Sequence, residues 1–299
     1  MRAAVLADVH GNYLALKACL DYAQTRGVEN YLFLGDYVTD HPYPQRVLEL
    51  LYQVKSRYAC RFIRGNREEY MLAHRENPGE WRECSSQGAL LHCYENLTEK
   101  DLAWFQSLPI YDEWRPAGAP AVALCHGSPQ KTRAAMRGED GTLQQLAVLG
   151  PDLLLKGHNH KQWSLFHQGK RLVCVGSVGN PVCRRARPGT AQATELAKVA
   201  QMTLLHLEEG RWRPEFLRIP YDWQRTLREL ETSGLAARAP VWAAMLRYNV
   251  LTGNDPCGAV PAWAAQLYQK ECGQLLPWPQ VPEEYWRKAA GEYGVELYP

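Results

Sequence analysis

The amino-acid sequence predicts an α/β (α+β) fold, a four-layer αββα sandwich in which two mixed β-sheets face each other and helices cover both outer faces. Three observations lead to this prediction. Short apolar segments alternate with amphipathic segments over residues 1–63, a rhythm typical of parallel strands joined by crossover helices. Further apolar segments follow residue 120. Polar residues come shortly after five of the apolar segments, as expected for a site at the carboxyl ends of strands.

The first 63 residues contain three predicted strands and two predicted helices. In the first helix, Leu16, Cys19, Leu20 and Ala23 follow the i, i+3, i+4, i+7 spacing of one apolar face. Pro44 is well suited to open the second helix, because its fixed φ and missing N–H are tolerated in a first turn. The predicted strands are residues 3–7, 31–34 and 58–63, and the predicted helices are residues 13–26 and a segment that begins at Pro44.

Residues 67–108 interrupt this rhythm with charged residues and strong helix formers. Thr98 and Asp101 have the spacing of a capping box, which predicts a helix that runs to Ser107 and ends before Pro109. Two interpretations stay open for the segment. It is either a helical insertion over the cleft or a set of ordinary outer-layer helices.

Strands return in the second half of the predicted sandwich. A late hairpin turns around Glu208-Glu209-Gly210, and we expect it to close the second sheet. The strands predicted here are residues 121–125, 152–155, 163–166 and 171–175, and those of the hairpin are residues 202–207 and 211–217.

The last 79 residues, 221–299, differ in amino-acid pattern from the predicted sandwich of residues 1–220. They contain five of the ten tryptophans, and Trp242, Met245 and Leu246 show helical spacing. Amphipathic helices that pack on the sandwich, or on a second subunit of a homo-oligomer, need such aromatic residues. We therefore expect a helical C-terminal appendage. An aromatic cofactor-binding box is the alternative interpretation.

Seven residues are candidate metal ligands, and each comes shortly after a predicted strand. One set of nitrogen and oxygen donors is Asp8, His10, Asp36 and His160, and a second set is Asp36, Asn66, His126 and His158. Because Asp36 belongs to both sets, it can bridge two divalent ions roughly 3.5–4 Å apart.

Two ions at that distance acidify a water between them and neutralise phosphoryl oxygens, so the chemistry to expect is in-line hydrolysis of a phosphate ester. The donor set lacks a thiolate. It therefore fits two divalent or trivalent transition-metal ions, Mn, Fe, Zn, Co or Ni, better than a soft metal or calcium. No binding site for an organic cofactor is predicted.

Five sequence blocks resemble the signature blocks of the calcineurin-like metallophosphoesterases. They are Ala7-Asp8-Val9-His10-Gly11-Asn12, Gly35-Asp36-Tyr37-Val38, Arg64-Gly65-Asn66, His126-Gly127 and Gly157-His158-Asn159-His160. A single Asp-x-His or His-x-His is common by chance, but five blocks in order are specific. The resemblance covers about residues 1–220. The first block, followed by Leu14, Ala15 and Leu16, is most similar to bacterial and archaeal predicted phosphodiesterases related to diadenosine tetraphosphatase.

The resemblance implies the metallophosphoesterase sandwich and a dinuclear metal-dependent phosphoesterase. Such an enzyme would hydrolyse phosphodiester or phosphoanhydride bonds, here of a nucleotide-type small molecule, by attack of a metal-bridging hydroxide. It also implies that Asp36 and Asn66 take part in catalysis. A phosphoprotein (Ser/Thr) phosphatase is the alternative enzyme, and a non-catalytic scaffold that binds protein partners is a further alternative.

The chain departs from the family pattern at the general acid. In many relatives a His follows the Asn of the third block, and an Asp three residues after the bridging Asp orients it. Arg67 and Thr39 occupy these positions here. Leaving-group protonation must then come from elsewhere or be unnecessary, as with a leaving group of low pKa. His41 and His92 are candidate acids, with a packing role as the alternative for each.

Several arginines are candidates for binding phosphate. Arg64 matches a phosphate-contacting position of related phosphatases, and its guanidinium can grip two oxygens at once; a structural salt bridge is the alternative. Arg67 is a second candidate. The block Gly176–Pro181 resembles the family's last block, which lines the cleft floor. Arg184, Arg185 and Arg187 after it could receive a polyphosphate tail or form a solvated loop.

Composition agrees with an enzyme that acts on a small molecule. The net charge is +2 over 299 residues, which argues against a dedicated nucleic-acid-binding protein. No long apolar run or signal peptide is present in the sequence, so we expect a cytoplasmic protein without membrane association. The nine cysteines contain no CxxC motif and are expected to be reduced.

Overall fold

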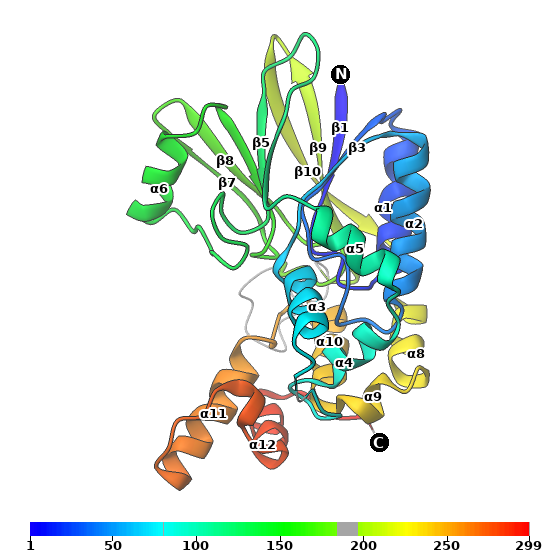
Figure 1. The fold of residues 1–299 in the computed structure, drawn as a ribbon, viewed down its shortest axis with the longest axis vertical. Helices are drawn as coiled ribbons and strands as arrows, with labels where there is room; N and C mark the ends of the chain where they lie inside the picture. Colours follow the sequence, from blue (N-terminus) through cyan, green and yellow to red (C-terminus); the bar gives the residue numbers. More distant parts are fainter. Residues whose placement is uncertain (80, 184–196, 299) are drawn as a thin grey trace.

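The fold consists of two five-stranded sheets and helices on their outer faces, as predicted (Figure 1). This computed structural model describes residues 1–79, 81–183 and 197–298. The first sheet has the order β10-β9-β1-β2-β3, and the second has the order β4-β5-β6-β8-β7. The strands are β1 (Arg2–Leu6), β2 (Asn30–Phe33), β3 (Ala59–Phe62), β4 (Tyr111–Trp114), β5 (Val122–Cys125), β6 (Leu153–Lys156), β7 (Gln162–His167), β8 (Lys170–Val175), β9 (Val199–Glu208) and β10 (Arg211–Pro220).

Both sheets are mixed. In the first sheet, β1, β2 and β3 are parallel, and Ala3 pairs with Asn30 in the register of β1 and β2. In the second sheet, β5, β6 and β8 are parallel, while β4 and β7 pair antiparallel at the two edges. The parallel strands of each sheet end on the same side of the molecule, which brings the loops that follow them together.

Alternation along β1 shows how the four layers form. Ala4 and Leu6 pack against α1 (Tyr13–Thr25) and α2 (Pro44–Arg57) on the outer face. Ala3 and Val5 belong to the core between the two sheets, because successive side chains of a strand point to opposite faces. On the far side of the second sheet, Leu146 of α6 (Asp140–Ala147) packs against residues of β5, β6 and β8.

The hairpin formed by β9 and β10 corrects one prediction, since it extends the first sheet and not the second. Strand β9 pairs antiparallel with β1, and Arg2 lies opposite His206. Met202 and Leu204 of β9 pack with the α1–α2 core, whereas Leu205 faces the second sheet. A strand that is apolar on both faces fits inside the sandwich beside β1. Strand β4 and helix α6 were also not predicted.

Each of the two interpretations that the sequence left open for residues 67–108 fits a different part of this segment. They contain α3 (Asn66–Glu76), α4 (Gly88–Glu95) and α5 (Glu99–Ser107). Helix α5 begins with the predicted capping box, in which the amide N–H of Thr98 and that of Asp101 donate to each other's side chains. Its Leu102 and Phe105 pack on the outer core as an ordinary outer-layer helix would. Helix α3 instead lies at the carboxyl ends of the strands.

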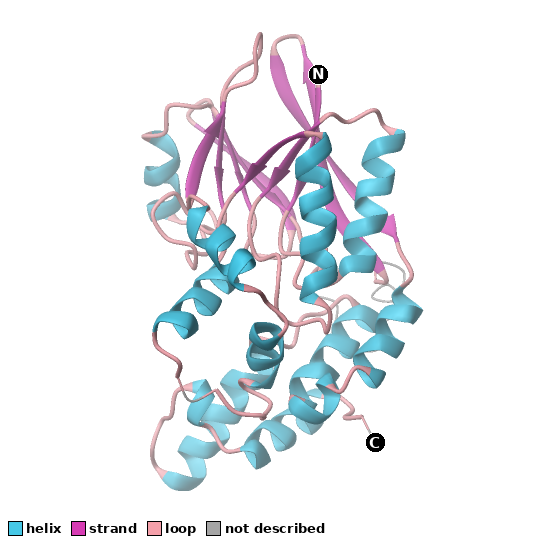
Figure 2. Cartoon of the chain, turned by 45° about the vertical axis from the view of Figure 1, so that its right-hand side comes forward, coloured by secondary structure: helices cyan, strands magenta, loops and turns pink. Residues whose placement is uncertain are grey.

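The C-terminal region is helical and lies beyond the carboxyl ends of the strands (Figure 2). It contains α8 (Trp223–Thr232), α9 (Leu235–Arg238), α10 (Pro240–Thr252), α11 (Ala259–Cys272), a 3-10 turn (Trp278–Gln280) and α12 (Glu283–Tyr293). Helices α10 to α12 share a core of their own. Side chains tie this region to the preceding chain: Glu283 accepts hydrogen bonds from Ser85, and Asn249 donates to the carbonyl of Pro181. Among the described residues, no helix is long and apolar enough to cross a membrane.

Candidate metal centre

The carboxyl ends of five strands bring the predicted ligands together. Asp8 follows β1, Asp36 follows β2 and Asn66 follows β3, where it opens α3. His126 comes directly after β5, and the loop Gly157–His160 comes directly after β6. The two sheets therefore contribute ligands to the same place.

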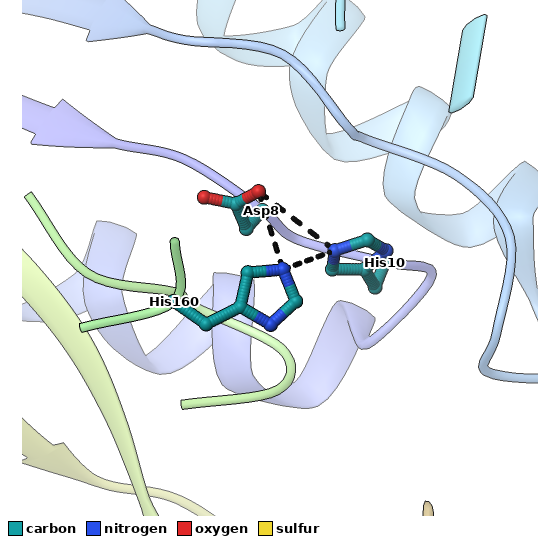
Figure 3. A group of neighbouring side chains, drawn as sticks. All are labelled: Asp8, His10 and His160. Carbon is teal, nitrogen blue, oxygen red and sulfur yellow. Dashed lines mark hydrogen bonds and ion pairs between the residues drawn. The ribbon is translucent and has the colours of Figure 1, made fainter. Parts of the chain in front are cut away.

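Asp8, His10 and His160 form the first group of donor atoms (Figure 3). The Nε2 atoms of His10 and His160 face each other at 3.0 Å. Asp8 Oδ1 lies 3.4 Å from Nε2 of His160 and 3.8 Å from Nε2 of His10. Two imidazoles and one carboxylate that converge in this way are typical of a transition-metal site.

Asp8, Asp36 and His126 form the second group, which adjoins the first. Nε2 of His126 lies 3.3 Å from Asp36 Oδ2, 3.2 Å from Asn66 Oδ1 and 3.9 Å from Asp8 Oδ1. Asp36 Oδ2 also lies 3.9 Å from Nε2 of His10 in the first group. Asp36 thus lies between the two groups, and so does Asp8, which the sequence assigned to one set.

Each of the three inward-facing imidazoles is oriented by an acceptor at its other ring nitrogen. Nδ1 of His126 lies 2.7 Å from the carbonyl oxygen of Leu34, and Nδ1 of His160 lies 3.0 Å from that of Asn180. Nδ1 of His10 lies 3.0 Å from Asp40 Oδ2. A proton on Nδ1 leaves the Nε2 lone pair free to bind a metal, and this arrangement is characteristic of metal-binding histidines. The residues present therefore fit divalent metal ions.

The charges of the site agree with this fit. Burial alone raises the pKa of Asp36, but His126 outweighs burial and holds the pKa well below its usual range. Burial alone lowers the pKa values of His126 and His160, but the buried carboxylates of Asp36 and Asp8 raise them to about 9. In the ion-free chain, protons on these rings balance the buried carboxylates. A metal ion supplies the same positive charge and displaces those protons.

The backbone of the ligand loops is strained in a way that is rare outside functional sites. Close packing accompanies the strain: a Cβ atom on Gly65 would lie 2.2 Å from Asp36 Oδ1, so only glycine fits there. The surrounding structure must hold these loops in place, because left-handed φ is unfavourable for residues with a Cβ. Five candidate ligands have positive φ, namely Asp8, His10, Asp36, His158 and His160.

His158 lies at the margin of the site in the ion-free chain. Its backbone N–H donates to Asp8 Oδ2 at 2.9 Å, and its ring centroid lies 5.2 Å from that of His126. Its side chain lines the cleft beside the two groups of donors. Burial lowers the pKa of His158 to about 4, so the ring is neutral, as a ligand must be.

Two buried side chains outside the predicted set fix the ligand loops. The carboxylate of Glu68 accepts hydrogen bonds from the backbone N–H groups of Asp36, Tyr37 and Gly65 at 2.8–2.9 Å. Burial, with the nearby charge of Asp36, raises the pKa of Glu68 to about 7. The ammonium group of Lys156 donates to the carbonyl oxygen of Gly157 at 3.0 Å and to the side chain of Asn159. It thereby orders the loop that carries His158 and His160.

The structure does not bring Arg64 to the cleft. Its guanidinium donates to the carbonyl oxygen of Gln106, in α5, at 3.4 Å, and Arg64 is not among the residues that line the cleft. The expectation that Arg64 grips a phosphoryl group is therefore not supported by its position. Helix α5 lies within reach of the side chain and offers it an acceptor, which the sequence alone did not indicate.

Arg67 does line the cleft, and Asp40 holds it there. The backbone N–H of Arg67 donates to Asp36 Oδ1 at 2.8 Å, and its Nη2 lies 3.5 Å from Asp40 Oδ1. Asp40 was missed from the sequence because it lies one residue beyond the position where relatives have an Asp. Thr39 and Asp40 both have positive φ, and in this turn Asp40 Oδ2 lies 3.0 Å from His10 Nδ1. Asp40 thus orients both His10 and the arginine at the usual position of the acid.

Neither candidate acid reaches the cleft. His41 Nε2 lies 2.9 Å from Asn180 Oδ1, and burial lowers the pKa of His41 to about 4. His92 Nε2 lies 2.8 Å from the carbonyl oxygen of Pro42. The block Gly176–Pro181 does reach the site, since Ser177 Oγ donates to the carbonyl oxygen of Asp8 and Asn180 lines the cleft. Arg184, Arg185 and Arg187 lie outside the described residues.

The donor groups lie at one end of a cleft of about 900 Å³. Residues of α3 and α4 form part of its wall, and residues of the C-terminal region form another part. Among its lining residues are His10, Asp36, Asn66, His158 and His160 at the metal end, and Tyr70, Trp81, Arg133, Trp242, Trp278 and Trp286 elsewhere.

Known proteins resemble this chain in sequence and in fold. It is 24% identical over 254 residues to the uncharacterized protein MJ0912 of Methanocaldococcus jannaschii, an alignment that covers 80% of this chain and 94% of that protein. The structure of hypothetical protein PH1004 from Pyrococcus horikoshii OT3 has a TM-score of 0.65 at 20% identity and covers 85% of this chain and 99% of its own. A metallophosphoesterase from Sphaerobacter thermophilus has a TM-score of 0.61 at 22% identity and covers 84% of this chain and 100% of its own.

The family model of the calcineurin-like phosphoesterases matches residues 1–162. This stretch includes β1 to β6 and all seven predicted ligands. The chain therefore belongs to the calcineurin-like phosphoesterase family and is a metal-dependent hydrolase of phosphoesters.

Proposed function

We propose that the chain hydrolyses phosphodiester or phosphoanhydride bonds of a nucleotide-type small molecule. Two transition-metal ions would take part, one held by each of the two donor groups. The observation that carries this proposal is the pair of adjoining groups, Asp8–His10–His160 and Asp8–Asp36–His126, at one end of a large cleft. When bound there, the ions would supply an acidified water and would neutralise the charge of phosphoryl oxygens. Mn, Fe, Zn, Co and Ni all suit the donors.

The protein's own groups then bind and orient the substrate. The guanidinium of Arg67 can contact phosphoryl oxygens beside Asp36 while Asp40 restrains it. Asp40 and Asp36 outweigh the effect of burial and raise the pKa of Arg67 still further above neutrality, so Arg67 stabilises charge and does not donate a proton. Because Arg67 occupies the position at which many relatives have the acid histidine, substrates whose leaving groups need no protonation are favoured. A nucleotide phosphate is such a leaving group.

We propose the same division of the chain as the sequence suggests. Residues 1–220, with the helical insertion of about residues 67–108, form the metallophosphoesterase sandwich, and residues 221–299 form a helical appendage packed on it. The hydrogen bonds of Ser85 with Glu283 and of Asn249 with Pro181 support this packing. The cleft residues Trp242, Trp278 and Trp286 give the appendage a part in the site.

An activity assay on protein loaded with manganese tests the proposed function. The panel contains bis(p-nitrophenyl) phosphate, dinucleoside polyphosphates, cyclic nucleotides, glycerol phosphate and a phosphopeptide. We expect hydrolysis of diesters or anhydrides, little hydrolysis of glycerol phosphate, and loss of activity after chelation. Preference for the phosphopeptide would favour a phosphoprotein phosphatase, and loaded protein that hydrolyses nothing would favour a non-catalytic scaffold; either result would overturn the proposal.

A further inference from the structure

Besides the metal ligands, the cleft is lined by aromatic side chains from two separate parts of the chain. Tyr70 belongs to α3, and Trp81 follows that helix. Trp242 belongs to α10, Trp278 to the 3-10 turn and Trp286 to α12. We call these five residues the aromatic wall. The metal chemistry of phosphoester hydrolysis uses none of them.

Arg67 connects the aromatic wall to the metal centre. Its guanidinium carbon lies 5.7 Å from the ring centroid of Tyr70 and 5.8 Å from that of Trp242. The backbone N–H of Arg67 donates a hydrogen bond to the carboxylate of Asp36. A second cation, Arg133, lies 4.4 Å from the ring centroid of Tyr70 and also lines the cleft. Two guanidinium groups therefore lie against the ring of Tyr70, and both line the cleft.

Two indole groups of the wall have a buried donor that is not used within the described residues. Nε1 of Trp242 and Nε1 of Trp286 are buried and have no hydrogen-bond acceptor there, although Trp286 is only 1% exposed. Buried indole N–H groups usually find an acceptor. Both side chains line the cleft, but the two nitrogen atoms are covered by protein atoms, so in this conformation their N–H groups are not open to a ligand.

The other two tryptophans of the wall, Trp81 and Trp278, differ in their surroundings. The ring of Trp81 stacks on that of His74, with centroids 3.9 Å apart and planes 6° apart, and this fixes its orientation. Trp278 is 43% exposed, which is unusual for a large apolar side chain that lines a cleft. An exposed aromatic ring in a cleft suits stacking with a planar ligand.

We propose that the aromatic wall binds the nucleobase of the substrate, while one phosphoryl group lies at the metal ligands and a second anionic group contacts Arg133. This inference rests on the proposed function and adds the part of the site that selects the substrate. A nucleobase provides a planar π-face that can stack on the exposed ring of Trp278. A volume of about 900 Å³ lies within the range of roughly 300–1,000 Å³ typical of small-molecule sites.

Two diesters with the same leaving group test the proposal. The p-nitrophenyl ester of thymidine 5′-monophosphate carries a base, and methyl p-nitrophenyl phosphate does not, so the ratio of their kcat/KM values reports recognition of the nucleoside. We expect the ratio to be high for the wild-type chain. Trp278→Ala should lower it roughly 5- to 150-fold, the range for loss of one stacking contact, and Trp278→Phe should retain most of it.

Trp263 offers a matched control. It is 42% exposed in α11, close to the 43% of Trp278, but it is not among the cleft residues. Trp263→Ala should leave the ratio unchanged. Substitution of exposed Trp278 avoids the core of the C-terminal helices, in which Trp286 is buried, so loss of the fold is not expected. Circular dichroism of each variant verifies this.

The outcomes separate the two proposals. If both diesters are hydrolysed at similar rates, or if Trp278→Ala leaves the ratio intact, the aromatic wall does not bind the base although the phosphodiesterase function stands. If neither diester is hydrolysed, the phosphodiesterase part of the proposed function fails, and the dinucleoside polyphosphates of the panel decide whether the phosphoanhydride part stands. In that case titration with thymidine 5′-monophosphate, followed by tryptophan fluorescence, still tests the wall. Quenching that persists with Trp263→Ala and disappears with Trp278→Ala supports it, and absence of quenching in the wild-type chain overturns it.

Discussion

The two ends of the cleft are built in different ways. At the metal end, buried side chains follow strand ends directly, and carbonyl oxygens or carboxylates hold the imidazoles of His10, His126 and His160. At the aromatic end, the side chains come from helices and irregular segments, and Trp278 is substantially exposed. The side chains of the metal end are thus buried and oriented without any ligand, whereas at the aromatic end the ring of Trp278 is open to solvent.

This difference suggests that the metal end carries out the reaction and the aromatic end selects the substrate. A change at the metal end should alter metal content or the rate with every substrate, because all substrates share the phosphoryl group. A change at the aromatic end should alter the ranking of substrates and leave metal content alone.

Asp36→Asn should have the largest effect, since it removes a carboxylate that lies between the two donor groups. We expect metal content to fall sharply and kcat/KM to fall by roughly 10³-fold or more for every substrate. Elemental analysis and the diester assay measure both quantities. Asp21→Asn, at an exposed residue paired with Lys17 on α1, is the control. An Asp36→Asn protein that kept full metal content and activity would remove Asp36 from the site.

Arg67→Ala and Arg64→Ala should separate two arginines that are three residues apart. Arg67 lines the cleft, whereas Arg64 contacts Gln106. Loss of one charge-assisted contact costs about 1.5–3 kcal/mol, so Arg67→Ala should lower kcat/KM roughly 10- to 150-fold. Arg67→Lys should restore part of the loss. Arg64→Ala should have little effect at unchanged metal content; the reverse pattern would return the phosphate-binding role to Arg64.

Asp40→Asn should weaken the site through residues that Asp40 orients. Asp40 lies within contact of His10 Nδ1 and of Arg67, and loss of a carboxylate behind a metal-binding histidine typically costs 10–100-fold in metal affinity or activity. Competition with a chelator measures metal affinity for Asp40→Asn and for the control Asp152→Asn, which alters an exposed carboxylate near Lys170. Equal metal affinity in both variants would contradict a positioning role for Asp40.

Metal binding should release protons near neutral pH. The pKa values of His126 and His160 are raised to about 9 in the ion-free chain, so both rings are protonated at pH 7 and a metal must displace those protons. Metal affinity should therefore rise with pH up to about 9.

By the same linkage, the raised pKa values of these histidines add to the free energy of unfolding of the ion-free chain. This contribution is fully present below pH 6.5 and is lost as pH rises through 9.

Calorimetric titrations with manganese in buffers of different ionisation enthalpy count the released protons. We expect up to two protons per chain at pH 7, and a number that declines as the pH approaches 9. A count of zero throughout this range would show that the imidazoles are neutral before metal binds.

The sequence indicated which side chains meet at the metal end, because each of them follows a recognisable strand pattern. Asp8, Asp36 and His126 all come shortly after apolar strands, and parallel strands of a sheet end on the same side. The layers were predictable for a similar reason, since alternation and helical spacing are local patterns. The hairpin was assigned to the wrong sheet because pairing of β9 with β1 joins residues about 200 positions apart in the chain.

The parts that were missed depend on contacts between distant segments. Asp40 reaches His10 only because Thr39 and Asp40 adopt left-handed backbone conformations. Arg64 points to α5 because Gln106 offers it a carbonyl oxygen. Tyr70 and Trp278 line the same cleft because the C-terminal helices pack beside α3. No spacing pattern in the sequence predicts that packing.

Anomalous diffraction from crystals grown with manganese tests the central claim most directly. The account predicts two anomalous peaks per chain, roughly 3.5–4 Å apart. One should lie among Asp8, His10 and His160, and the other near Asp36, Asn66 and His126. A single peak in protein that is fully active, or peaks away from both donor groups, would contradict it.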